Sequence, residues 1–139
     1  MRRAFLLTLA LGFAALVAVA YLIWSFREFR VSGTITIASH LHRRVPQGQV
    51  VLFVIAKNKG GVPIAMQRIV NPQFPVSFHL RNADLIVPDS RVRDAMILQA
   101  QMNTHGQAGH PQPGDLEGSA KDLVLPGERD THIVIDKEL

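Results

Sequence analysis

The first thirty residues of this chain contain one long apolar run, from Ala4 to Phe26, with arginines on both sides of it. At about 1.5 Å of rise per helical residue the run extends about 34 Å, which exceeds a hydrocarbon core of about 30 Å. The run therefore predicts a membrane anchor in residues 1–30, with Ala4 to Phe26 spanning the bilayer. Residues 31–139 then form the soluble part.

A cleavable signal peptide is the alternative interpretation of the same run. Arg2 and Arg3 resemble the basic start of a signal peptide, and residues 18–20 have the small-x-small form of a cleavage site. Beyond that point the run continues with Tyr21 and Trp24, aromatic residues that are enriched at membrane interfaces. These features favour an uncleaved anchor.

The charges that flank the run predict its orientation. Arg2 and Arg3 precede it, whereas Arg27 and Arg30 follow it with Glu28 between them. By the positive-inside rule we expect a cytoplasmic amino terminus. The prediction is a single-pass protein of the bacterial inner membrane with a periplasmic C-terminal domain.

Charge and cysteine content exclude several functions for the soluble part. Residues 1–30 hold four arginines and one glutamate, so residues 31–139 hold the other eleven basic and ten acidic residues and contribute only +1 of the net +4. Nucleic-acid binding requires a clustered basic face and is not expected. The chain has no cysteine, which excludes disulfides, thiol redox chemistry and C-x-x-C-H haem attachment.

The apolar pattern of the soluble part favours strands. Val31–Ile37 alternates, with Ile35 and Ile37 on one face, whereas Val50–Ala56 is a continuous apolar run that suits a strand covered on both faces. Short segments of this kind, separated by Gly, Pro and Asn turns, predict an antiparallel β-sandwich of six or seven strands in two sheets. The expected strands are 31–37, 50–56, 62–70, 74–80, 96–102 and 131–135.

One connection is long for a compact domain. The segment 103–118 reads NTHGQAGHPQPGDLEG and contains four glycines, two prolines and two histidines. Long loops are more often functional than short ones. We therefore expect this loop to be a recognition surface. Val45–Gly48, in contrast, reads as an ordinary tight turn.

The order of these motifs resembles one known family, the C-terminal periplasmic immunoglobulin-like domain of the CycH-type cytochrome c biogenesis proteins. These are the I subunits of the bacterial c-type cytochrome maturation system. The resemblance covers nearly all of residues 31–139. It rests on Val31–Ile37, Val45–Gly48, Leu52–Ala56, Gly61–Ala65, Phe74–Leu80 and, most specifically, Pro111–Gly118.

The resemblance implies an immunoglobulin-like fold and a non-enzymatic module that handles apocytochrome c or assists haem-protein assembly. Its partners would be apocytochrome c or the haem-ligation machinery, and no cofactor is expected; a respiratory complex is the partner only in the alternative function class given below. The candidate partner-binding residues are His105, His110, Pro111, Pro113, Gly114, Asp115 and Glu117.

Specific roles follow from the chemistry of this segment. Pro111 and Pro113 lower the entropy lost on binding, and Gly114 and Gly118 allow the backbone to turn. Asp115 and Glu117 either accept from a basic partner or satisfy backbone donors of their own turn. A peptide partner could also add to a sheet edge as an extra strand.

Histidine and methionine raise a metal hypothesis, which we do not favour. His40 and His42 would lie on one side of an extended segment, and Met96, Met102, His105 and His110 could gather near the long loop. None of these spacings is a strong metal signature, and the two methionines share their strand parity with Leu98 and Ala100, which indicates core packing. We predict neither a metal site nor catalysis.

A second function class remains open. Small residues occur along the apolar run and would allow close packing against other membrane helices; they are Gly12, Ala14, Ala15, Ala18 and Ala20. The chain could then be a single-span accessory subunit of a membrane-bound oxidase or reductase.

Overall fold

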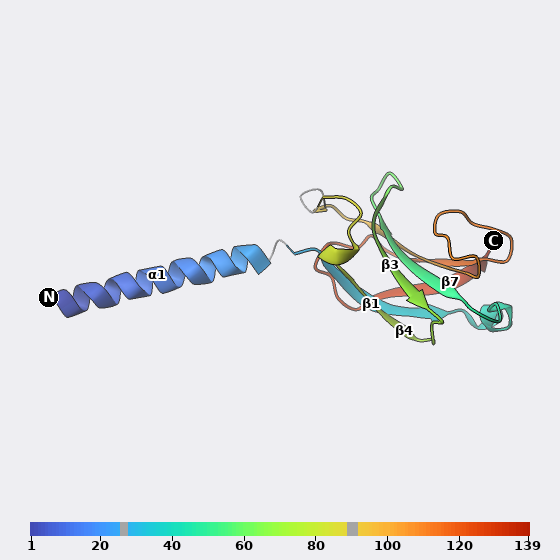
Figure 1. The fold of residues 1–139 in the computed structure, drawn as a ribbon, viewed down its shortest axis with the longest axis horizontal. Helices are drawn as coiled ribbons and strands as arrows, with labels where there is room; N and C mark the ends of the chain where they lie inside the picture. Colours follow the sequence, from blue (N-terminus) through green and yellow to red (C-terminus); the bar gives the residue numbers. More distant parts are fainter. Residues whose placement is uncertain (26–27, 89–91) are drawn as a thin grey trace.

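A computed structural model describes residues 1–25, 28–88 and 92–139. Its first element is a helix, α1 (Arg2–Ser25), which extends away from a β-domain (Figure 1). The helix is long and apolar enough to cross a membrane, and none of its span Arg2–Trp24 is buried by the rest of the chain. Phe26 and Arg27, the predicted end of the span and its flanking charge, lie outside the described residues.

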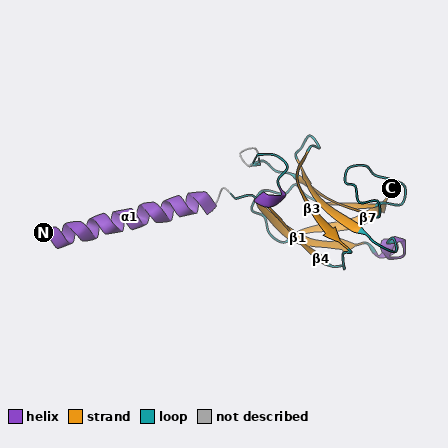
Figure 2. Ribbon diagram, in the orientation of Figure 1, coloured by secondary structure: helices purple, strands orange, loops and turns teal. Residues whose placement is uncertain are grey.

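Seven strands follow the helix and form one continuous sheet (Figure 2). Their order in the sheet is β3-β2-β5-β6-β7-β1-β4, and all neighbours are antiparallel except β1 and β7, which are parallel. The strands are β1 (Arg30–Ile37), β2 (Val51–Lys57), β3 (Pro63–Val70), β4 (Val76–Arg81), β5 (Ile97–Asn103), β6 (Leu116–Ala120) and β7 (Thr131–Glu138).

The predicted fold class, a β-sandwich preceded by an apolar helix, is confirmed, with one difference in how the two layers arise. They are not separate sheets, because the single sheet bends until its edge strands β3 and β4 come into contact. The backbone N–H of His79 in β4 donates to Oε1 of Gln67 in β3 at 3.1 Å. A side chain thus joins the two edges where no backbone ladder does.

Alternating side chains fill the space between the two layers. β4 shows the pattern most simply, because Val76, Phe78 and Leu80 are buried while the residues between them are exposed. The core also contains Met96 and Met102, as predicted from their parity, and both are fully buried. His79 and His132 point outward, again as predicted.

Strand β6 was not predicted and corrects the extent of the long loop. The connection ends at Asp115, and Leu116–Ala120 pairs with both β5 and β7. Its sequence, LEGSA, has one large apolar residue and a glycine, so its alternation is too weak to indicate a strand. Gly118 therefore has a different role from the turn proposed for it.

Two glycines allow the neighbouring strands β6 and β1 to approach the backbone of β7 closely. A Cβ atom on Gly118 of β6 would lie 1.9 Å from the Val134 carbonyl oxygen, and one on Gly33 of β1 would lie 1.8 Å from that of Thr131. Both distances are far below any van der Waals contact. The sheet can approach β7 this closely only because these two positions lack side chains.

The loops gather at the two ends of the sandwich. The end at which the chain enters from α1 comprises residues 28–30, 57–62, 81–88, 92–96 and 121–130, and we call it the helix-side end. The opposite end, which we call the far end, comprises the connections 38–50, 71–75 and 104–115. Strands of seven or eight residues separate the two ends by about 25 Å.

Replacement of Gly118 by alanine tests the close approach. We expect Gly118→Ala to lower the free energy of unfolding by about 1–3 kcal/mol, because its methyl group overlaps backbone that cannot move aside. For a domain of this size the midpoint of thermal unfolding would then fall by roughly 4–20 °C. Ser119→Ala, at the exposed neighbouring position, is the control and should change little. Equal midpoints for the two variants would contradict this role of Gly118.

Candidate protein-interaction site

The long connection 104–115 is packed onto the outer face of the sheet by side-chain amides of β5. Asn103 is only 2% exposed and forms two hydrogen bonds to the loop. Its Nδ2 donates to the Gln107 carbonyl oxygen at 2.9 Å, and its Oδ1 accepts from the Gly106 N–H at 2.8 Å. The beginning of the loop is therefore folded back toward the strand that it leaves.

Gln101, two residues earlier on the same face, makes the next connection. Its Oε1 accepts from the Gly109 N–H at 3.1 Å, while its Nε2 lies 3.5 Å from Oε2 of Glu117 on the adjacent strand β6. Because Gln101 is 7% exposed, this polar group is covered by the loop that it binds. The sequence shows these amides only as the polar side of an alternating strand, so their function was not anticipated.

An apolar patch continues this contact on the neighbouring strand. Val51, Phe53 and Ile55 form a small outer cluster on β2, against which Met66 of β3 and Ala108 of the loop pack. The predicted coverage of this strand on both faces is therefore confirmed, and part of the cover is the loop itself.

The end of the loop is closed by Asp115. Its Oδ2 accepts from the backbone N–H of Gln112 at 2.8 Å and lies 2.9 Å from Nε2 of His105. A carboxylate can only accept, so Nε2 is the donor, and Nδ1 is the other ring nitrogen of His105. That nitrogen is buried without a hydrogen-bond partner among the described residues. The pair joins the two halves of the loop across its base.

The backbone after β7 supports the same corner. The Gly114 N–H donates to the Leu139 carbonyl oxygen at 2.9 Å, and the Leu139 N–H donates to the Asp115 carbonyl oxygen at 2.9 Å. Gly114 itself has a φ of +93°, which glycine adopts without strain. The turn that was predicted at Gly114 is therefore present.

The longest exposed stretch of this connection is a short tip, residues 109–114, with the sequence GHPQPG. His110, Pro111 and Pro113 lie on this surface, and Nδ1 of His110 is 3.3 Å from the Ala108 carbonyl oxygen. The tip stands on a base of buried hydrogen bonds and apolar contacts. Such a surface loses little conformational entropy when it binds a partner.

The seven predicted site residues thus fall into three groups. His110, Pro111, Pro113 and Gly114 are exposed on the tip, whereas the carboxylate of Asp115 is occupied within the loop by His105 and Gln112. For Asp115 the geometry matches the interpretation in which it satisfies donors of its own turn. Glu117 lies in β6 beside Gln101 instead of in a turn. Partner binding by these residues stays a prediction.

The two sheet edges offer limited room for an added strand. Beside β3, the Ile86 N–H donates to the Ile64 carbonyl oxygen at 2.8 Å, and Leu85 forms a bridge with Ala65. Beside β4, the Arg81 N–H donates to Asp84 Oδ2 at 2.8 Å. Backbone groups at the helix-side half of both edges are therefore already in use, which leaves the loop tip as the more accessible surface.

The two histidines of the segment 39–44 do not form the pair that was considered. That segment is a 3₁₀ helix held by the buried side chain of Leu41, instead of an extended strand. With three residues per turn, positions two apart point in different directions, so His40 and His42 diverge. Among the described residues, no group of three or more His, Cys, Asp or Glu side chains could hold a metal ion.

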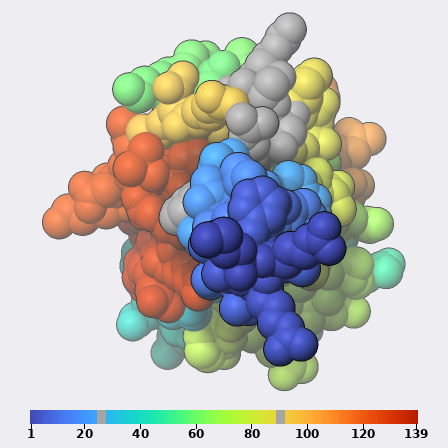
Figure 3. Space-filling view, turned by 90° about the vertical axis from the view of Figure 1, so that its left-hand side faces the viewer, coloured from blue at the N-terminus to red at the C-terminus, as the bar shows by residue number. Residues whose placement is uncertain are grey.

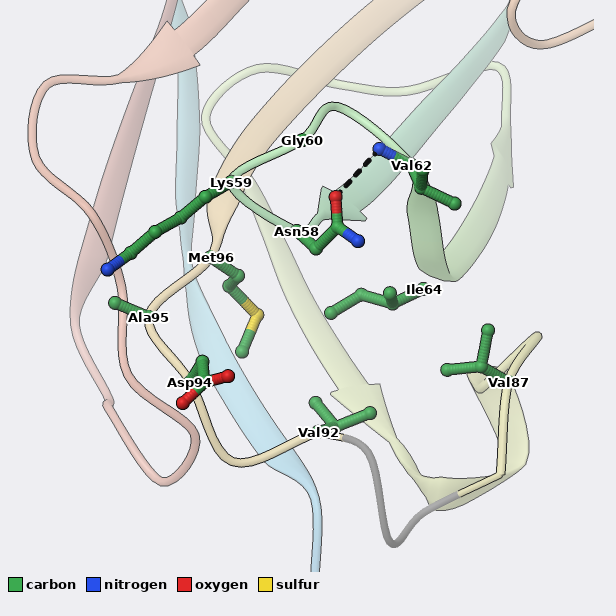
Figure 4. Close-up of a pocket in the computed structure, with 10 residues that line it drawn as sticks. All are labelled: Asn58, Lys59, Gly60, Val62, Ile64, Val87, Val92, Asp94, Ala95 and Met96. Carbon is green, nitrogen blue, oxygen red and sulfur yellow. Dashed lines mark hydrogen bonds between the residues drawn. The ribbon is translucent and has the colours of Figure 1, made fainter.

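A cleft of about 550 Å³ lies at the opposite, helix-side end (Figure 4). Ile64, Val92 and Met96 line its apolar side, and Lys59 and Asp94 lie at its polar side. The Val62 N–H donates to Asn58 Oδ1 at 2.9 Å and fixes the hairpin beside it. These side chains form no metal-ligand group and no arrangement of nucleophile and base.

Fold and site together define a class: an immunoglobulin-like β-domain that follows an apolar helix and displays a fixed proline-rich loop tip. Comparison with known families makes the assignment specific. Residues 31–136 match the family model of the cytochrome c-type biogenesis protein H Ig-like domain, and this chain belongs to that family. The resemblance seen in the sequence is thereby confirmed.

Two individual proteins are similar to this chain. An uncharacterized protein of Aquifex aeolicus (strain VF5) is 27% identical over 113 residues, which are 81% of this chain and 73% of that protein. The structure of an alternative pilotin from the type II secretion system of Vibrio cholerae superposes with a TM-score of 0.46 at 10% identity. It covers 78% of this chain and 96% of the pilotin chain.

The hydrogen bonds of Asn103 provide a test of how the tip is held. We expect Asn103→Ala to increase amide hydrogen exchange at Gly106 by about 10-fold or more, because the Gly106 N–H loses its buried acceptor and such a lost hydrogen bond costs about 1–3 kcal/mol. Thr104→Ala, at the exposed next position, is the matched control. If both variants exchange like the parent chain, Asn103 does not fix the loop.

Proposed function

We propose that this chain is a non-enzymatic, membrane-anchored periplasmic module that binds a protein partner in c-type cytochrome biogenesis. The partner is apocytochrome c or a component of the haem-ligation machinery. The observation that supports this most strongly is the family match over residues 31–136, which includes residues of all seven strands and the whole loop tip. The unburied apolar helix α1 supports the membrane anchor.

The far-end loop tip is the proposed binding surface. It combines a pre-formed shape with the exposed residues His110, Pro111 and Pro113. Because the Asp115 carboxylate is already occupied, attraction of a basic partner is not the main source of affinity in this proposal. Shape complementarity and apolar contact with the tip are the main source of affinity instead.

The position of the tip fits an anchored protein. The strands are about 25 Å long, so the far end lies about that distance from the helix-side end. A partner bound at the tip would therefore lie clear of the lipid headgroups. This distance suits the capture of an extended polypeptide or of the periplasmic part of another membrane protein.

Co-purification tests the partner. We expect the tagged full-length chain, extracted in mild detergent, to recover apocytochrome c or haem-ligation proteins. The triple variant His110→Ala, Pro111→Ala, Pro113→Ala should reduce that recovery by about 10-fold, the effect of losing about 1.4 kcal/mol of binding free energy.

The control is Gln73→Ala, an exposed position on another loop of the same end. Equal recovery with both variants would exclude the tip as the binding surface. Recovery in fixed ratio with a mature oxidase or reductase, without haem-ligation proteins, would instead identify an accessory subunit of a respiratory complex.

The proposed orientation can be tested directly because the chain has no cysteine of its own. We expect Ser39→Cys, exposed at the far end, to react in intact cells with a maleimide that crosses the outer but not the inner membrane. Arg3→Cys, before the apolar segment, should react only after the inner membrane is opened. The reverse pattern would place the domain in the cytoplasm.

A further inference from the structure

The helix-side end exposes a set of large apolar side chains that the core does not require. In the described part of the β-domain, five large hydrophobic residues are exposed, and four of them belong to this end. The four are Val62 (53%), Ile86 (57%), Leu123 (49%) and Leu125 (52%), whereas Val70 (46%) lies where β3 ends at the far end. Single exposed apolar residues are ordinary, but their concentration at one end is not.

These four residues come from three separate loops. Val62 ends the hairpin between β2 and β3, Ile86 follows β4, and Leu123 and Leu125 lie between β6 and β7. Figure 3 views the molecule from the helix side, with the hairpin in green, the segment after β4 in yellow and the connection before β7 in orange-red around the blue helix. All three loops therefore border the face that α1 leaves.

The exposure is fixed by backbone hydrogen bonds. Val124 is buried, and its N–H and C=O both pair with Met96 at 2.8 Å, so the alternating side chains of Leu123 and Leu125 point away from the core. A further hydrogen bond fixes Leu125: its backbone N–H donates to Oε1 of Glu128 at 3.0 Å. Such a segment cannot turn these two side chains inward without losing its pairing.

Hydrogen bonds also fix the backbone of Ile86 and Val62. The Ile86 N–H donates to the Ile64 carbonyl oxygen at 2.8 Å. The Val62 N–H donates to Asn58 Oδ1 at 2.9 Å, and its carbonyl oxygen accepts from the Asn58 N–H at 2.9 Å. The apolar side chains are thus presented on a rigid frame.

Chain connectivity limits what can lie opposite this face. α1 ends at Ser25, and Phe29 is already part of the domain, because its side chain is 2% exposed and its N–H donates to Asn82 Oδ1 at 2.8 Å. Four residue steps reach at most about 14 Å. If α1 spans the bilayer as proposed above, the helix-side end lies within that distance of the hydrocarbon boundary.

We infer that the helix-side end of the β-domain rests on the bilayer, with Val62, Ile86, Leu123 and Leu125 inserted at the boundary between headgroups and acyl chains. This inference rests on the proposed membrane anchor. The face has no charge bias, since its described residues include seven Lys or Arg and six Asp or Glu. Apolar insertion, and not attraction to anionic lipid, is therefore the driving force. The contact holds the loop tip at a fixed height above the membrane.

Spin labels on single cysteines test the inference in the full-length chain reconstituted in phosphatidylcholine vesicles. We expect labels at Leu123→Cys and Val62→Cys to lose accessibility to a water-soluble nickel chelate and to gain accessibility to oxygen. Val70→Cys, equally exposed at the far end, should remain accessible to nickel. Leu9→Cys, within α1, should be the most protected.

A second substitution separates apolar insertion from mere proximity to the membrane. Adding Leu125→Asp to the Val62→Cys chain should restore nickel accessibility at Val62, and raising the salt concentration should change nothing. Unchanged protection in the Asp variant, or protection lost in salt, would overturn the inference. So would protection that disappears when the protein is diluted in lipid, which would mean that a second copy covers the face.

The two hypotheses fail differently. A nickel-accessible label at Leu9 would show that α1 does not span the bilayer and would remove the proposed anchor. A protected label at Leu9 together with aqueous labels at Val62 and Leu123 would overturn only the bilayer contact of the β-domain.

Discussion

The structure depends on how closely the backbone packs around β7. Gly33 on one side and Gly118 on the other leave no side chain between this strand and its neighbours, where a Cβ atom would lie less than 2 Å from a carbonyl oxygen. β7 is also the strand at which the parallel pair with β1 meets the antiparallel pair with β6. Close packing there allows one sheet to bend into two layers. Because the loops connect the ends of the strands, each of them lies at one of the two ends of the sandwich.

The far-end loop shows how a glycine- and proline-rich segment becomes a defined surface. Gln101 and Asn103 bind its backbone from below, Ala108 contacts the outer apolar cluster, and Asp115 closes its base with His105. Buried polar groups of this kind are stable only when they are paired, so the loop and the outer face of β5 stabilise each other. The exposed tip, residues 109–114, is thereby separated from the residues that hold it.

The two ends then have different physical character, which is consistent with a tethered binding module. The far end presents a fixed polar and proline-rich tip, whereas the helix-side end concentrates the exposed aliphatic side chains of the domain. The β-domain belongs to the cytochrome c-type biogenesis protein H Ig-like family. In our proposal, one end holds the domain at the membrane and the other binds the polypeptide to be handled.

The sequence by itself determined the apolar helix, the all-β class and six of the seven strands, because these depend on local apolar periodicity. It also determined that Met96 and Met102 are buried, since strand parity fixes the face of a side chain. Tertiary structure decided what local pattern does not encode: that Gly118 lies in a strand because the neighbouring backbone needs its space, and that His40 and His42 lie in a 3₁₀ helix anchored by Leu41. It also decided that Asp115 is occupied inside the loop, because its partner His105 is brought to it only when the segment folds back on β5.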